Sequence, residues 1–326
     1  MKFFKYVLVS AVFLLGLNSC EKKPENQWKV TLKNPAQKVE LSDISKEFYD
    51  SKIPLEDFKK KYPWFQGTVP DEDFATRRMD EEEIKIYKEA ISKIDPIKLN
   101  KELSDLFAHV KIYFPGFQTP KVFLYSSALQ GMMEPVFFEP KENLVFIDIT
   151  GFMGDNNPNY KGVETYFQAS MNPQNIIPKV SETVAKNFIL PNAKQQKFID
   201  ELVYQGKILT LQDAFLPDFP DYLKMNYTQK QYEWAQENEV NIWNFFVENN
   251  LVFSDDIRLN ERFIKPAPFS KFYTEIDNES SPQVGIFVGW QICKKFYKEN
   301  PDTPLAAFLQ LDAQKIFNDS KYKPKN

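Results

Sequence analysis

The chain has 326 residues, of which 43% are hydrophobic and 15% aromatic, so it is long and apolar enough to bury a large core. Its formal net charge of −4, without a basic stripe, argues against nucleic acid as a partner. It contains one histidine, His109, and two cysteines, Cys20 and Cys293. A zinc site with two or three histidines is therefore excluded, and we expect no metal and no other cofactor.

The first twenty residues have the pattern of an export signal. Two lysines precede an apolar run over residues 6–17, which is shorter than the ~20 residues that a membrane-spanning helix needs. The Leu-Asn-Ser sequence before Cys20 resembles a bacterial lipobox, in which the cysteine is acylated and becomes the first residue of the mature protein. We therefore expect residues 1–19 to be a lipoprotein signal peptide and Cys20 to be the lipidation site. The alternative is an ordinary cleaved signal followed by a chance cysteine.

The lipid bilayer is therefore the first expected partner, reached through acylated Cys20. A lipobox cysteine carries two acyl chains through its sulfur and a third on its new amino group. Three chains are more than the two membrane-binding groups that stable anchoring requires. Loss of residues 1–19 removes two lysines and no acid, which lowers the formal net charge from −4 to −6. Residues 20–40 contain scattered prolines and many charges, and they predict a lipidated tether. Glu21 differs from the aspartate that retains some lipoproteins in the inner membrane, which favours the periplasmic side of the outer membrane.

Helical patterns dominate residues 41–113, and strand patterns follow. Asp80 and Glu83 form a capping arrangement before apolar residues spaced three and four apart, at Ile84, Tyr87, Ile91 and Ile94. Between residues 120 and 152, three short β-branched and aromatic runs are bounded by Pro, Gly and Asn, and they read KVFLYSS, EPVFFEP and NLVFIDITGF. These runs predict three strands.

From residue 172 onward the pattern is again helical. Apolar residues share one helix face at Val180, Val184 and Phe188, and a second helix carries Phe198, Leu202 and Leu209. Thr228 and Gln231 form a capping box, and Pro304 begins a last helix. Gly285 and Gly289 lie one helical turn apart, which permits a close approach of two backbones. The sequence thus predicts one α+β domain over residues 41–326, predominantly helical, with a small β-sheet.

Other candidate sites are weak. Cys293 and His109 are expected to be structural. Asp155, Asn157 and Asn159 alternate as in a calcium loop, but the closing position is Tyr166, so a surface loop is favoured. Three carboxylates flank the predicted strands, at Glu134, Glu139 and Glu142, and a glycosidase would need two acids that face one cleft.

Five segments in the second half of the chain resemble, in order, those of the gliding-motility lipoprotein GldB family. They read YQGKILTLQDAFLPD, YTQKQYEWAQENEVNIW, RFIKPAPFSKFYTEI, SPQVGIFVGWQICKKFY and FNDSKYKP. The resemblance implies an exported lipoprotein that is required for bacterial surface gliding and is linked to an associated secretion apparatus. It implies no established reaction.

That family resembles, more distantly, zincin-type metallopeptidases with the helical motif H-E-x-x-H. When this motif is aligned with residues 181–185, Ser181 and Ala185 stand at the histidine positions and Glu182 at the position of the general base. Gln205 then stands at the position of the third ligand. The resemblance implies a degenerate zincin-like core without metal ligands. The simpler interpretation is that Glu182 and Lys186 form an i, i+4 ion pair on a solvated helix face.

We therefore expect a non-catalytic accessory protein that is anchored by lipid in the cell envelope. Its partners would be envelope proteins of the gliding and secretion machinery, which dock on its surface. The alternative is a metal-independent carboxylate hydrolase, or a binding lipoprotein, that acts on glycan or peptidoglycan.

Overall fold

The fold is built around a four-stranded sheet. A computed structural model describes residues 27–32, 36–190, 196–275 and 277–325. The strand order is β1-β2-β4-β3, in which β1, β2 and β4 are parallel and β3 is antiparallel to β4. The bounds are β1 (Leu41–Asp43), β2 (Lys121–Tyr125), β3 (Val136–Glu139) and β4 (Leu144–Asp148). The three predicted strands are confirmed, whereas the three-residue β1 was not predicted.

Five helices accompany the sheet in the first part of the chain. They are α1 (Ile44–Phe48), α2 (Leu55–Lys61), α3 (Asp71–Arg77), α4 (Glu81–Ser92) and α5 (Pro96–Tyr113). The predicted cap of α4 is confirmed, because Asp80 Oδ1 accepts a hydrogen bond from the Glu83 backbone N–H at 2.9 Å. The helix ends at Ser92, so Ile94 lies beyond it although its side chain is buried.

The second part of the chain is almost entirely helical, which confirms the predominantly helical α+β class. Its α-helices are α6 (Thr165–Gln168), α7 (Ile176–Lys186), α8 (Phe198–Phe215), α9 (Asp221–Lys224), α10 (Gln229–Glu237), α11 (Glu239–Glu248), α12 (Arg258–Phe263), α13 (Val284–Glu299), α14 (Leu305–Gln310) and α15 (Ala313–Ser320). Four 3₁₀ turns complete it: η1 (Ile149–Phe152), η2 (Pro158–Tyr160), η3 (Pro173–Asn175) and η4 (Asp277–Glu279).

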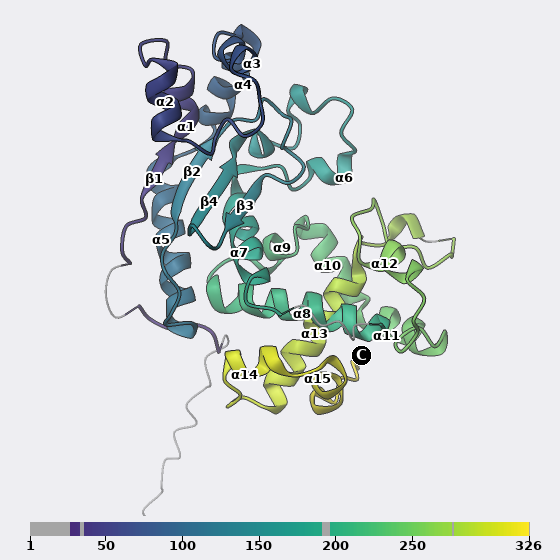
Figure 1. Ribbon diagram of the computed structural model, residues 1–326. Coiled ribbons are helices and arrows are strands. Elements are labelled where there is room, and N and C mark those ends of the chain that lie inside the picture. The colour runs from purple at the N-terminus through teal and green to yellow at the C-terminus, as the bar shows by residue number, and fades with distance from the viewer. Residues whose placement is uncertain (1–26, 33–35, 191–195, 276, 326) are drawn as a thin grey trace, which may run out of the picture.

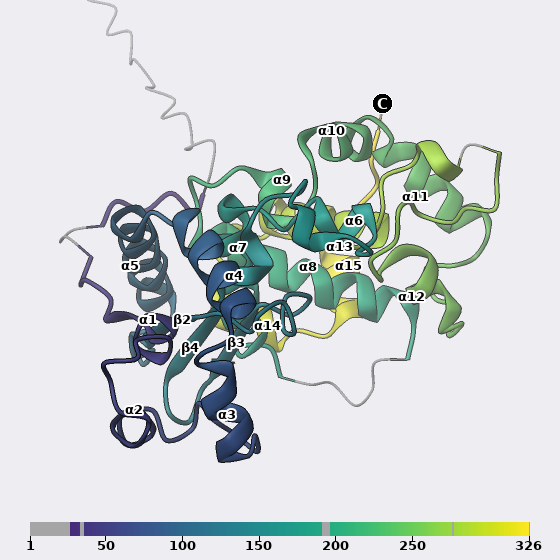
Figure 2. The same ribbon diagram turned by 90° about the horizontal axis from the view of Figure 1, so that it is seen from above.

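Helices α7 and α8 occupy the middle of the molecule. In both ribbon views they lie between the sheet with α1–α4 and the group formed by α10, α11 and α12 (Figures 1 and 2). The predicted capping box at Thr228 is confirmed, but the helix that it begins ends at Glu237. Asn238 closes α10 and opens α11, so a stretch with one start signal contains two helices.

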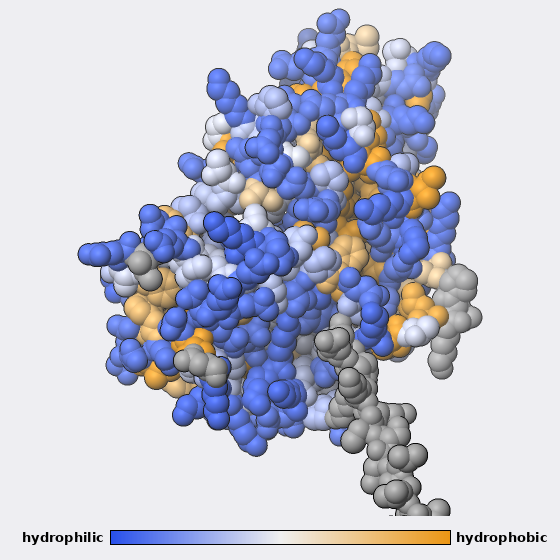
Figure 3. All heavy atoms as spheres, turned by 180° about the vertical axis from the view of Figure 1, so that it is seen from behind, coloured by the Kyte–Doolittle hydropathy of each residue, from blue (hydrophilic) through white to orange (hydrophobic). Residues whose placement is uncertain are grey.

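One large hydrophobic cluster joins the two parts of the chain. It contains Val122 and Val145 from the sheet, Leu202 from α8, and Trp290 from α13, all of them almost fully buried. A smaller cluster around Phe48 lies between the sheet and the first helices. Viewed from behind, most of the surface is hydrophilic, and apolar residues form a band in the upper part (Figure 3). Among the exposed apolar residues is Phe137 of β3.

Helices α8 and α13 approach each other closely at two glycines, Gly206 and Gly289. A Cβ added to Gly289 would overlap the carbonyl oxygen of Leu202, and one added to Gly206 would overlap the backbone of Gly289 and the Cys293 sulfur. Only glycine permits this distance between the two backbones. The predicted close approach at Gly289 is therefore confirmed, with α8 as the partner.

Gly289→Ala is expected to lower the free energy of unfolding by about 3 kcal/mol or more, because the added methyl group has no space between α8 and α13. The measurement is urea unfolding of the detergent-solubilised chain, followed by circular dichroism. Gly116→Ala is the control, since nothing lies within 4 Å of its added Cβ, and it should stay within about 0.5 kcal/mol of the wild type. Equal stability of the two variants would refute the close contact.

Candidate functional site

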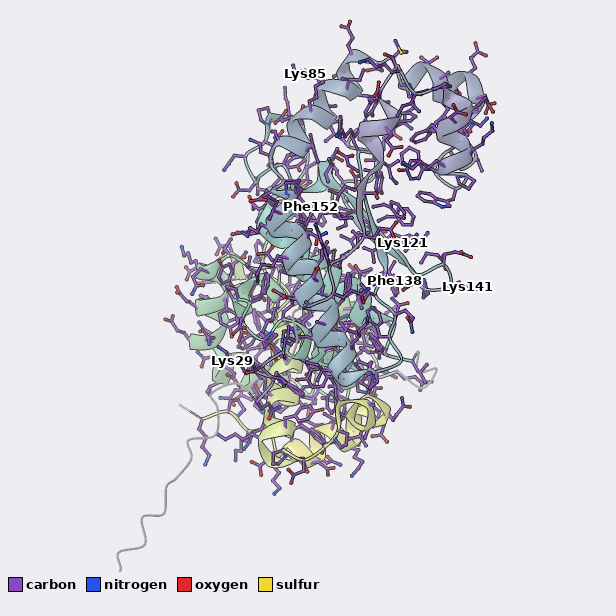
Figure 4. The ribbon with its side chains drawn as sticks, turned by 90° about the vertical axis from the view of Figure 1, so that its left-hand side faces the viewer. Lys29, Lys85, Lys121, Phe138, Lys141 and Phe152 are labelled. Carbon is purple, nitrogen blue, oxygen red and sulfur yellow. The ribbon has the colours of Figure 1, made fainter. Side chains whose placement is uncertain are left out.

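A cavity of about 410 Å³ lies between α7, α8 and the segment that leads into β3. Helix α7 contributes Lys179, Glu182 and Lys186 to its lining, and α8 contributes Gln205 and Gln212. The other walls come from η1, α6, α9, the segment after α12 and the start of α13. We call this space the α7–α8 cavity. Phe152, one of its lining residues, lies within the body of the molecule in Figure 4, far from the surface residues Lys29 and Lys85.

Two of the four residues singled out by the metallopeptidase resemblance line this cavity. Glu182 and Gln205 come from different helices and both belong to its wall. Ser181 and Ala185 are 0% exposed and are not among the lining residues, and the Ser181 hydroxyl has no partner among the described residues. The difference follows from helix geometry, since residues 179, 182 and 186 share one face and residues 181 and 185 lie on another.

Glu182 is held between two lysines. Its Oε2 accepts from Lys179 Nζ at 3.0 Å, and its Oε1 accepts from Lys186 Nζ at 2.6 Å. We call these three residues the Glu182 triplet. The ion pair expected between Glu182 and Lys186 is present, but the carboxylate side chain is only 18% exposed and faces the cavity. It does not lie on a solvated face.

The lysines determine how Glu182 ionises. Burial raises the pKa of this carboxyl, but the two ammonium groups outweigh burial and lower the pKa to about 2. A general base near neutral pH needs a pKa near the working pH. A carboxylate with a pKa of about 2, whose two oxygens already accept from ammonium groups, is a poor base.

Gln205 is neutral and already bonded. Its Nε2 donates to Glu201 Oε1 at 2.8 Å, one helical turn earlier on α8. Within the described residues, no group of three His, Cys, Asp or Glu side chains lies close enough to hold a metal ion. The expectation of a degenerate zincin-like core stays a prediction.

Two buried amide oxygens in the cavity wall have no hydrogen-bond partner among the described residues. They are Oδ1 of Asn175, which is 2% exposed, and Oε1 of Gln212, which is 0% exposed. The Nε2 of Gln212 donates to the carbonyl of Pro178, so the nitrogen of this amide is hydrogen-bonded and its oxygen is not. Such acceptors cost about 1–3 kcal/mol each when they are left without a donor.

A buried ion network adjoins the cavity through Lys224, and no pattern in the sequence predicted it. Lys224, which is 3% exposed and lines the cavity, donates to Asp213 Oδ1 at 2.7 Å and to Asp221 Oδ1 at 3.1 Å. The Trp290 indole donates to Asp213 Oδ2 at 2.8 Å, and Lys294 binds Asp221 Oδ2 at 2.9 Å. Removal of one charge from such a buried set typically costs 3–5 kcal/mol.

The remaining candidates from the sequence are not among the residues that line the cavity. Cys293 is free and 0% exposed, and burial raises the pKa of its thiol to about 12. The ring of His109 is 9% exposed, and its Nδ1 lies 2.8 Å from the carbonyl oxygen of Asp105, one turn earlier. In the loop considered for calcium, Asn157 and Asn159 donate their side-chain amides to Glu89 on α4.

The carboxylates near the strands do not converge on the cavity. Glu139 lies on β3, and Glu134 and Glu142 lie in the segments on either side of that strand. None of the three is among the lining residues, and Glu182 is the one acid in that set. The pair of facing acids that a glycosidase needs is therefore not found there.

The family comparison confirms the resemblance that the sequence segments indicated. The family model of gliding motility protein GldB matches residues 25–324. The chain belongs to this family. The GldB family implies a role in gliding motility, and the match spans the sheet, the α7–α8 cavity and the last helix. A search of curated proteins finds no match, and a search of solved structures finds none either.

The predicted membrane anchor is not part of the described structure. Cys20 and the apolar run before it lie outside the described residues. Among the helices of the described part, none has both the length and the apolar character that a membrane span requires. Lipidation of Cys20 therefore stays a prediction.

Glu182→Gln is expected to lower the free energy of unfolding by on the order of 1–2 kcal/mol at pH 7, because it removes the charge that both lysines bind. The folded pKa of about 2 lies below the unfolded value of about 4.3. The contribution is therefore present above about pH 4.3 and is lost as the pH falls from there towards 2. Urea unfolding of both proteins from pH 7 to pH 2.5 measures this difference.

Glu248→Gln is the matched control, because Glu248 is an exposed glutamate on α11. Its effect should be small at every pH. A wild-type advantage over Glu182→Gln that stayed constant from pH 7 to pH 2.5 would contradict the charge state assigned to the Glu182 triplet.

Proposed function

We propose that this member of the GldB family is an exported, lipid-anchored accessory protein of the gliding machinery and its associated secretion apparatus. It acts by docking to another envelope protein, without catalysis, and the α7–α8 cavity is the docking surface. The family membership supports the link to gliding. The observation that supports the non-catalytic part is the Glu182 triplet, in which the carboxylate that the metallopeptidase resemblance would make the general base is held in an ion pair with two lysines.

Three features favour docking over turnover. Glu182, the one acid among the described lining residues, is paired with lysines, so it neither accepts a proton readily nor attracts a cation. The two unpartnered amide oxygens suit a stable bound group with N–H donors. The lining also includes Met132, Phe152 and Phe167, which provide apolar contact area.

The alternative from the sequence, a carboxylate hydrolase acting on glycan or peptidoglycan, receives no support from the cavity, because Glu182 has no second acid opposite it among the described residues.

The anchor in this proposal is acylated Cys20, on the periplasmic side of the outer membrane. Cys20→Ala is expected to move the protein from the membrane to the soluble periplasmic fraction, because the acyl chains supply the membrane affinity. Fractionation of cells and immunoblotting measure this, and metabolic labelling with a palmitate analogue should be lost in parallel. Cys293→Ala is the control and should keep both the label and the membrane fraction. Retention of the label in Cys20→Ala would refute the anchor.

The docking surface can be tested separately from the anchor. Ser170 is half-buried and lines the cavity, so Ser170→Trp should fill it and reduce gliding speed at least about tenfold with unchanged protein abundance. Ser51→Trp, at an exposed turn between α1 and α2, is the control and should glide normally. Glu182→Gln should also glide normally, because no reaction depends on that carboxylate and the substitution keeps the size of the side chain and both lysines of the docking surface. Single-cell tracking on glass measures all three.

If Glu182→Gln stopped gliding at normal abundance, the non-catalytic function would be wrong. If Ser170→Trp glided like the wild type, the cavity would not be the docking surface.

A further inference from the structure

The α7–α8 cavity carries one positive charge in excess. Within the Glu182 triplet, Lys179 and Lys186 share a single carboxylate, and their side chains are 31% and 46% exposed. The other two lysines of the lining are paired with carboxylates outside it. The local charge of the triplet is therefore +1, and a bound group with one negative charge would balance it.

The wall of the cavity also contains hydrogen-bond acceptors that lack a donor. Asn175 makes no side-chain hydrogen bond among the described residues, and its Oδ1 is buried without a partner, as is Oε1 of Gln212. Rotation about the last torsion of an Asn side chain is soft, so this oxygen can turn toward a donor that enters the cavity. A ligand that combines a negative charge with N–H groups would satisfy both features.

The cavity also has a large apolar surface. Its lining includes Met132, Pro135, Phe152, Phe167 and Leu209, and its volume of about 410 Å³ lies within the usual range for ligand sites, roughly 300–1,000 Å³. A purely ionic ligand such as phosphate would leave this surface in contact with water. The ligand should therefore bring apolar groups as well.

The neighbouring sheet edge favours a peptide over a sugar. β3 is an edge strand, and Asp148 N–H donates to the carbonyl of Pro135 at 2.7 Å. Alternation along an antiparallel pair then directs the backbone groups of Val136 and Phe138 away from β4, where no strand of the described chain pairs with them. Met132 and Pro135, which precede β3, line the cavity. A peptide could pair with such an edge, and a sugar could not.

We propose that the α7–α8 cavity binds the carboxyl-terminal end of a polypeptide. The terminal carboxylate binds Lys179 and Lys186, backbone N–H groups bind the amides of Asn175 and Gln212, and apolar side chains contact the rest of the lining. This inference rests on the proposed docking function and adds the chemical class of the partner: a protein with an accessible, apolar C-terminus.

The test uses two N-acetylated tetrapeptide libraries that differ only at the C-terminus, one with free carboxylates and the other amidated. The full chain, solubilised in detergent and immobilised, should retain at least about ten times more of the free-carboxylate library, as measured by mass spectrometry. Lys186→Met should reduce that retention about tenfold, because it removes one of the two ammonium groups. Equal retention of both libraries, or of neither, would overturn the proposal.

Lys315→Met is the matched control. Lys315 forms a helical i, i+4 ion pair with Asp319 on α15, comparable to the pair of Lys186 with Glu182, but lies far from the cavity lining. It should retain peptides like the wild type, and equal losses in both variants would overturn the assignment. Tighter binding of tri-N-acetylchitotriose than of any peptide would assign the cavity to a sugar and would also overturn it. If Ser170→Trp lost gliding but the wild-type chain retained no peptide, the docking function would stand. The binding of a C-terminal carboxylate in the cavity would be refuted.

Discussion

The contact between α8 and α13 is the constraint on which the rest of the structure depends. Gly206 and Gly289 bring the two backbones so close that carbonyl groups and glycine Cα atoms take the space of side chains. At this distance the Trp290 indole on α13 donates a hydrogen bond to Asp213 on α8. The same carboxylate accepts from Lys224, which lines the cavity. A close helix contact without polar content thus determines where a buried ion network forms.

The two principal helices of the cavity differ in their main packing partner. α8 packs most extensively against α13, whereas α7 packs against α8, β3 and α5. Lys179, Glu182 and Lys186 extend from α7 into a cavity whose lining is otherwise largely apolar. Such long side chains can contact an apolar wall with their stems while their charged ends pair with one another. The Glu182 triplet is the result.

The sequence predicted the helical class, three strands, the caps at Asp80 and Thr228, and the close approach at Gly289, because each rests on local chemistry or spacing. It missed β1, whose three residues pair with β2 about eighty positions later and carry too little pattern to recognise. It also placed Ser181, Glu182 and Ala185 on one functional segment, whereas the helix directs only the glutamate into the cavity. The excess charge could have been suspected from Lys179 and Lys186, which flank Glu182 at helical spacing, but the unpartnered amides depend on tertiary packing.

The Glu182 triplet also bears on what the introduction of metal ligands on α7 would require. Two histidines at positions 181 and 185 would enter a region where both side chains are 0% exposed, on the face of α7 that packs against its neighbours. A dication near Glu182 would in addition meet two ammonium groups within hydrogen-bonding distance of that carboxylate, and like charges in a partly buried site repel strongly. The absence of histidine ligands is therefore only one of two obstacles to metal binding at this position. The lysines make the same position suitable for an anion, which is the chemistry expected of a surface that binds another protein's carboxylate.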